Sequence, residues 1–352
     1  MIERDDLRAA VSSGLLTEKQ AATLISFADS RRGARENLAV GDEPFELFKG
    51  FNEIFIVIGL IILATGWYGV TGLSLGTEIV NLQTYAVMVT SIGALVLWLL
   101  SEYFVRHRRM VAPAIALSIM FAGNAAFGFV AGMAQLFMLG QGDLSSVPLP
   151  LLLATGSLVI YWWRFRVPFA MAMIAIGLFV TTIVFTAAQG GEIRDPSDLF
   201  LLSADGPFAW ITLALGVAVF AVAMIFDMSD PHRVTRRSAN GFWLHVVAAP
   251  ALINTIALSA MEQDAFGVLL WILGFFALVA IIIDRRSFLI TAIGYVVAVT
   301  ATVFDGSGIA MTVLILGVGL LLLGALWEQI RATILHLLGG VLPLDKLPPS
   351  HA

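Results

Sequence analysis

The sequence predicts an all-α, polytopic integral membrane protein: a helical bundle of about ten transmembrane helices behind a small cytoplasmic helical hairpin. Hydrophobic residues make up 59% of the 352 residues and charged residues only 13%, which is far from the composition of soluble globular domains. Long apolar runs recur between residues 53 and 327. Most have the length that a helix rising about 1.5 Å per residue needs to cross a hydrocarbon core. Arginines gather in every second turn between these runs.

Before the bundle, residues 1–42 predict a hairpin of two short helices and a polar linker. Gly14 stands where a helix C-terminal cap is expected, and Thr17 with Gln20 matches the capping box that begins a second helix. Two helices with so little apolar surface are not expected to be stable alone. We therefore expect the hairpin to dock on the bundle or on a protein partner. DNA binding is not expected, because neither helix is basic.

The bundle itself is predicted over residues 43–327, beginning with an amphipathic elbow at residues 44–51. Tryptophans and tyrosines stand at several predicted span ends, as in the aromatic belts of membrane proteins. The predicted spans are residues 53–71, 82–103, 110–135, 148–163, 167–188, 208–226, 241–258, 265–283, 287–304 and 308–327.

Charged residues in the turns predict the orientation. By the positive-inside rule the arginine turns are cytoplasmic, and both termini then lie on that side. Contact of the arginines with anionic lipid headgroups is an alternative to a pure topology signal. The basic turns hold Arg106, Arg108, Arg109, Arg164, Arg166, Arg233, Arg236, Arg237, Arg285 and Arg286, and the opposite turns hold Glu78, Asp143, Glu192, Asp195, Asp198, Asp205, Glu262, Asp264, Asp305 and Arg194.

Residues 328–352 predict a cytoplasmic tail that lies on the membrane surface. The acidic, polar N-terminus has no apolar run before Ile54, so no cleavable signal peptide is expected. With 17 arginines against 3 lysines, the chain is typical of a GC-rich bacterial genome. We therefore expect a bacterial inner membrane.

Polar residues inside the spans are the places where function could reside, because a polar group in hydrocarbon needs a partner. In the third span Asn124, Gly128, Gly132 and Gln135 fall on one stripe of a helix. Two interpretations are open: a polar seam along a solute path, or a close helix contact in which the glycines admit a neighbour and the amides bond across it.

The seventh span offers a second place. Pro250 lies in mid-helix, so the carbonyl of Val246 loses its donor, and Asn254 stands one turn further on. His245 near the cytoplasmic end could titrate near neutral pH or serve as an interhelical donor. A broken helix that binds a small solute and an ordinary proline kink are both open interpretations.

Motifs of enzymes, cofactors and metals were sought and are absent from the sequence. It holds no phosphate loop, no metal helix of the H-E-x-x-H type and no nucleophile elbow. Cysteine is absent, and the five histidines have no carboxylate at a recognised ligand spacing. The sequence therefore predicts no catalytic, cofactor-binding or metal residues, no nucleic-acid partner and no enzyme activity.

The N-terminal pattern resembles one known group of proteins. Residues 6–11, Asp-Leu-Arg-Ala-Ala-Val, and residues 14–21, Gly-Leu-Leu-Thr-Glu-Lys-Gln-Ala, are similar to uncharacterised bacterial predicted multipass membrane proteins, a 2157-like domain of unknown function. The resemblance is specific over about the first 60 residues. It implies a small cytoplasmic module ahead of a multihelix region, and no activity.

Two functions follow as hypotheses. The first is a transporter or channel-like protein for a small neutral solute, because no carboxylate stands near the centre of a predicted span to couple an ion. The alternative is a membrane-anchored scaffold or sensor whose N-terminal hairpin binds a partner. Membrane lipids are the other expected partners.

Overall fold

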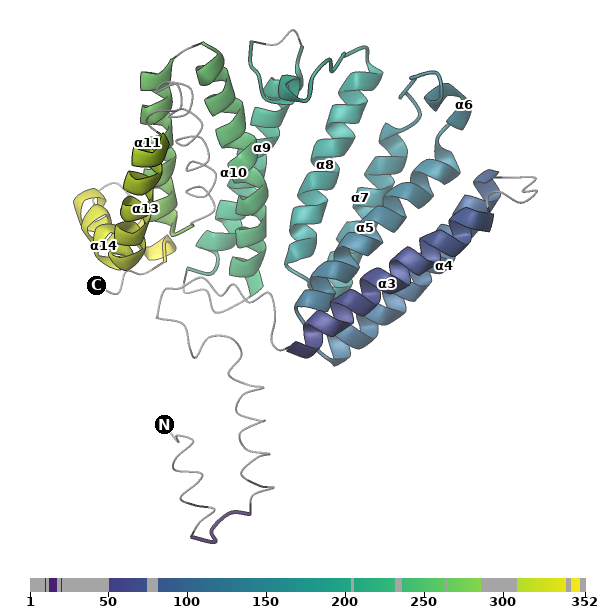
Figure 1. Cartoon of the computed structure of the whole chain (residues 1–352), viewed down its shortest axis with the longest axis horizontal. Coiled ribbons are helices and arrows are strands. Elements are labelled where there is room, and N and C mark those ends of the chain that lie inside the picture. Colours follow the sequence, from purple (N-terminus) through teal and green to yellow (C-terminus); the bar gives the residue numbers. More distant parts are fainter. Residues whose placement is uncertain are drawn as a thin grey trace.

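A computed structural model describes residues 10, 13–17, 20, 51–74, 82–203, 206–231, 236–263, 265–285, 309–339 and 343–348, and every regular element among them is a helix (Figure 1). The all-α prediction is confirmed for this part of the chain. The elements are α3 (Phe51–Ser74), α4 (Leu82–Ser101), the π-helix η2 (Glu102–His107), α5 (Ala112–Met133), α6 (Leu136–Leu139), α7 (Pro148–Phe165), α8 (Phe169–Ala188), η3 (Pro196–Leu199), α9 (Phe208–Met228), α10 (Arg236–Glu262), α11 (Phe266–Ile283), α13 (Ile309–Ala325), α14 (Trp327–Leu338) and η4 (Leu344–Lys346).

Six of the described helices are long and apolar enough to cross a membrane: α3, α4 continued through η2, α5, α8, α9 and α10. The count becomes seven if the bent pair α13 and α14 forms one span. The predicted spans 148–163 and 265–283 are the helices α7 and α11, which lie outside the six. The predicted span 287–304 lies outside the described residues. The number of ten is therefore not confirmed.

The long helices lie side by side in a row, and neighbours in the chain contact one another from α4 to α11 (Figure 1). Because successive helices run in opposite directions, alternate turns meet at the same end of the row. We call this the arginine end, since the turns there carry the arginines between residues 106 and 109, 164 and 166, and 236 and 237, together with Arg285.

The start of α3 is fixed at the arginine end by Glu53. Its buried carboxylate accepts hydrogen bonds from the backbone N–H groups of Val111, at 3.3 Å, and Ala112, at 2.9 Å. These N–H groups open α5 and have no partner within the helix, so an anion there also meets the positive end of the helix dipole. Little of the remainder of α3 is fully buried, since only 6% of its apolar stretch lies inside the protein.

Three apolar cores among the described residues hold the row together, and the smallest of them joins α8, α9 and α10. An aromatic core joins α4, α5 and α7, where the ring centroids of Trp98 and Phe165 are 4.9 Å apart and those of Phe121 and Tyr161 are 4.8 Å apart. The second core lies between α10 and α11. The α10 helix is the most buried of the six, with 61% of its apolar stretch inside the protein, so side chains on α10 are held by neighbours on several sides.

Both local signals predicted for the N-terminal hairpin are present. Gly14 has a positive φ of 74°, and Leu15 N–H donates to Ala10 O at 3.0 Å, as in a helix C-terminal cap. Thr17 N–H donates to the Gln20 side chain at 3.0 Å, and Gln20 N–H donates to Thr17 Oγ1 at 3.3 Å, which completes the capping box. Most of the two helices lies outside the described residues, so the hairpin stays a prediction.

The C-terminal helix α14 turns away from the line of the bundle. It is bent by 73° from the end of α13 and contacts α11. Arg331 is buried and its Nε donates to Ile281 O at 3.2 Å, while its Nη2 donates to Pro348 O. This part of the predicted tail is thus tied to the arginine end of α11, and its position on a membrane surface stays a prediction.

Candidate functional site

The predicted stripe on α5 faces α4 over three of its four residues. Asn124 is buried, and its Nδ2 donates to Thr90 O at 2.9 Å. At Gly128 a Cβ atom would lie 2.7 Å from Thr90 Oγ1, so only glycine lets the two helices come this close. Gly132 accepts a hydrogen bond at its carbonyl oxygen from Gln83 Nε2 at 2.6 Å. These three residues form a contact between α4 and α5.

Gln135 does not belong to the stripe. The predicted span ran through residue 135, but α5 ends at Met133 and Ala134 is extended. Gln135 is exposed, and its backbone N–H donates to Ser146 Oγ at 3.0 Å. The helical spacing that placed Gln135 beside Gly132 therefore does not apply.

A small cavity adjoins Asn124 between α3, α4 and α5. Its volume is about 70 Å³, which is room for a few water molecules, and its lining is mainly apolar. The indole Nε1 of Trp67 is buried there and has no hydrogen-bond partner in the part of the chain that the structure describes. An N–H donor and a carboxamide thus border the same small cavity near the α3 edge of the row.

In α10, Pro250 and Asn254 lie within one continuous helix of 27 residues. Both side chains are half-buried, and the neighbours Ala249 and Ile253 are fully buried. Pro250 and Asn254 are on the same helix as His245 but not on the α5 stripe, and α8 stands between the two helices (Figure 1). The structure therefore separates the predicted residues into two places.

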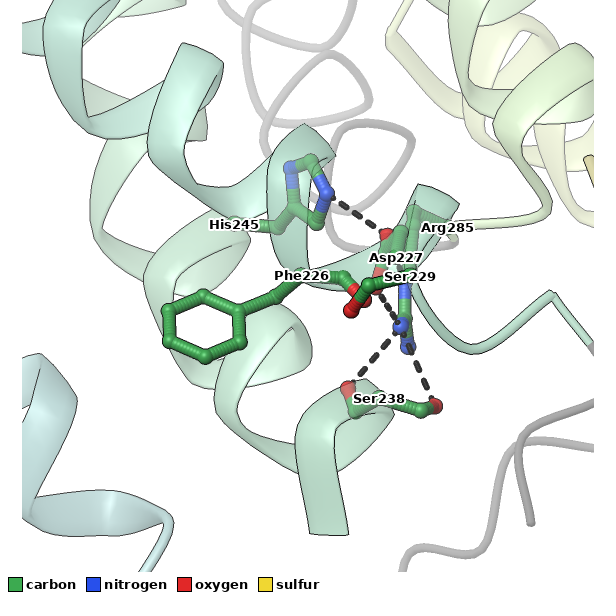
Figure 2. Close-up of polar contacts among 6 residues, drawn as sticks. All are labelled: Phe226, Asp227, Ser229, Ser238, His245 and Arg285. Atoms are coloured by element: carbon green, nitrogen blue, oxygen red, sulfur yellow. Dashed lines mark hydrogen bonds and ion pairs between the residues drawn. The ribbon is translucent and has the colours of Figure 1, made fainter. Parts of the chain in front are cut away.

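His245 belongs to a buried group of paired charges between α9, α10 and the end of α11 (Figure 2). Its Nε2 lies 2.9 Å from Asp227 Oδ2. Arg285 donates to the same carboxylate, from Nε to Oδ2 at 2.9 Å and from Nη2 to Oδ1 at 2.5 Å. Arg285 Nη2 also donates to Ser238 O at 3.0 Å. We call Asp227, Ser238, His245 and Arg285 the ion cluster.

The ion cluster is almost closed to solvent. The exposed fractions are 6% for Asp227, 0% for His245 and 1% for Arg285. A buried charge is costly unless it is paired and its hydrogen bonds are satisfied, and here the carboxylate has a bidentate arginine and an imidazole. The charges of the ion cluster are therefore paired with one another inside the protein and do not face a substrate site.

Local backbone features bring the three ionisable groups together. Asp227 is the penultimate residue of α9, and Gly241 on α10 leaves the space that its carboxylate occupies. Asp284 has a positive φ of 56° just after α11, a conformation in which it ends the helix and turns the chain. Arg285 follows directly and enters the cluster. The side chain of Asp284 accepts a hydrogen bond from Trp327 Nε1 at 2.7 Å.

The ion cluster and Asp284 therefore link four helices at the arginine end: α9, α10, α11 and α14. Arg285 was predicted only as one residue of a basic turn, and His245 only as a single titratable or donor group. No recognised ligand spacing in the sequence reveals the carboxylate partner of His245, because Asp227 is 18 residues away. The one available signal is that these charges each follow directly on an apolar run.

On the opposite side of the bundle, acidic residues structure a loop. Asp195 accepts hydrogen bonds from the backbone and hydroxyl of Ser197, and these hold the pKa of its carboxyl below its ordinary value. Asp198 accepts from the backbone N–H of Arg194 at 2.9 Å. Within the described ranges, no three histidine or acidic side chains come together as a metal site.

Comparison with known proteins gave no match to a family model, to a curated protein or to a solved structure. The similarity of residues 6–21 to a family of bacterial membrane proteins therefore remains a prediction.

Proposed function

We propose that the chain is a bacterial inner-membrane protein with both termini in the cytoplasm, acting as a membrane-anchored scaffold or sensor. In this proposal the N-terminal hairpin binds a protein partner, and the bundle holds the hairpin against the cytoplasmic face. No catalytic reaction and no cofactor is part of the proposal.

The proposal is supported by the contacts that the buried polar side chains of the described helices make with one another. Asn124 and the α5 glycines serve a helix contact, while the buried charges gather and pair at the arginine end. The positive-inside rule assigns that end to the cytoplasm. Since α3 also begins there, beside Val111 and Ala112, the chain before residue 51 enters the bundle from the same side.

Deleting residues 1–42 tests the scaffold or sensor. We expect a strain that makes only residues 43–352 to show the same growth phenotype as a strain without the gene, because the bundle alone lacks the hairpin that binds the partner. The control is the amount of truncated chain in the membrane, which must equal that of the full chain. Retention of the full phenotype by the truncated chain would contradict the proposal.

A second candidate is a transporter or channel-like protein for a small neutral solute. The small cavity beside Asn124 favours it, because a neutral solute or water there would find one carboxamide and the Trp67 Nε1 donor, which has no hydrogen-bond partner among the described residues. Pro250 and Asn254 would contribute only if a path also ran along α10.

Cysteine labelling separates the two candidates, because the chain has no cysteine of its own. We expect N124C and N254C to stay unlabelled by a membrane-impermeant maleimide in both intact and inverted vesicles, since a scaffold needs no water path. S145C, in an exposed turn, serves as the labelled control. Labelling of N124C would instead support the transporter.

A further inference from the structure

We infer that the arginine end holds a binding site for a phosphate group, in a cavity between α7, α9 and α10. The cavity has a volume of about 540 Å³, which is within the range of small-molecule sites. Three arginines line it: Arg166 just after α7, and Arg236 and Arg237 at the start of α10. The inference concerns a ligand and applies to a scaffold, a sensor or a carrier, so it goes beyond the proposed function.

Two of the three arginines, Arg166 and Arg236, have no acidic partner among the described residues. The described residues that line the cavity include no acidic side chain. Elsewhere at the arginine end, Glu102 pairs with Arg164 at 2.7 Å and with Arg106 at 3.0 Å. By contrast, the described residues place no carboxylate within ion-pair distance of Arg166 or Arg236.

The nearby carboxylate of Asp227 does not fill this role. Phe226 and Ser229, on either side of Asp227 in the sequence, both line the cavity. Figure 2 shows the ring of Phe226 pointing away from the ion cluster, whereas the carboxylate of Asp227 faces Arg285 and His245. The carboxylate of Asp227 is thus already paired with Arg285 and His245.

The guanidinium of Arg166 is held in place before any ligand arrives. Arg166 ends α7 with a φ of 55°, and its guanidinium carbon lies 5.2 Å from the centre of the Trp162 ring. Trp162 Nε1 donates to Asn240 Oδ1 at 3.5 Å. Asn240 is 6% exposed, and its Nδ2 donates to no protein atom among the described residues. A ligand would therefore meet an oriented guanidinium and an amide donor, which lowers the ordering cost of binding.

This donor set fits a phosphate group. A guanidinium offers a planar pair of N–H donors that matches two phosphate oxygens, and charge-assisted bonds of this kind are the strong ones. Ile225, 67% exposed, stands at the edge of the cavity and offers an apolar surface to an acyl chain. The headgroup of an anionic phospholipid supplies both features, and a soluble phosphate supplies the first.

The test is calorimetric titration of the full chain in neutral detergent with a short-chain phosphatidic acid and, separately, with inorganic phosphate. We expect saturable binding, and we expect R166Q/R236Q to raise the dissociation constant by about 10- to 100-fold, because two charge-assisted contacts are lost. The matched control is R108Q/R109Q, which removes two arginines at the same end, including Arg109 with its similar φ of 53°. The control is expected to change the constant less than about threefold.

Binding of both ligands would assign the site to phosphate from either source, and binding of the lipid alone would assign it to a headgroup. Equal binding by the wild type and R166Q/R236Q, or equal loss in R108Q/R109Q, would overturn the inference. A second variant, R166K/R236K, keeps the positive charge at both positions and therefore disturbs folding less than R166Q/R236Q. It lacks only the planar pair of N–H donors. We expect it to bind more weakly than the wild type, and unchanged binding would also overturn the inference.

Discussion

Replacing Asp227 by asparagine is expected to lower the free energy of unfolding by about 3–5 kcal/mol, the usual cost of removing one partner of a buried ion pair. Arg285 is 1% exposed and has its Nε and one Nη committed to this carboxylate. In D227N the arginine would keep its charge and its burial but lose the anion. One of the two oxygen positions would become an NH2 group, so either His245 Nε2 or an N–H of Arg285 would face a donor in place of an acceptor. Thermal unfolding in detergent measures the loss.

Two control variants distinguish the effect of breaking the ion cluster from the effect of removing any charged residue. R194A removes an exposed ion pair with Glu192, at 3.6 Å, and is expected to change stability by less than about 1 kcal/mol. The double variant D227L/R285M removes both buried charges together, and we expect it to be more stable than D227N, because apolar residues can replace a buried ion pair. If D227N unfolds at the wild-type temperature, the cluster does not hold the three helices.

The positions of the helices could be predicted to a large extent from the sequence. The predicted spans 82–103, 167–188 and 208–226 correspond to α4 with η2, to α8 and to α9. Hydropathy is sufficient here because each span must be apolar over a length set by the hydrocarbon core. The end of α5 is one exception. Apolar residues continue past Met133, so nothing in the composition marks the extended Ala134 that removes Gln135 from the stripe.

The pairing of side chains could not be predicted in the same way. Asp227 and Arg285 are 58 residues apart, and their contact depends on α9 and α11 both lying against α10 at matching depth. A single sequence contains the charges but not the register that aligns them. The α5 glycines are different, because their spacing of four residues lies within one helix and is visible in the sequence.

The second large effect is expected at that glycine contact: G128A should lower the free energy of unfolding by about 1–3 kcal/mol, the usual cost of overpacking a tight site. A Cβ atom at residue 128 would lie 2.7 Å from Oγ1 and 2.9 Å from Cβ of Thr90, which is itself buried. Both distances are shorter than van der Waals contact, so α4 and α5 would have to separate. The hydrogen bond from Asn124 to Thr90 O would then lengthen.

G123A is the matched control, because a Cβ at residue 123 of the same helix would have no atom within 4 Å. Alanine is the better helix former by about 1 kcal/mol, so G123A is expected to leave stability unchanged or to raise it. In T90G/G128A the small residue moves to the facing helix, and most of the lost stability should return. Equal melting temperatures for G123A and G128A would mean that α4 and α5 do not meet at this distance, and Asn124 would then be free to line a solute path.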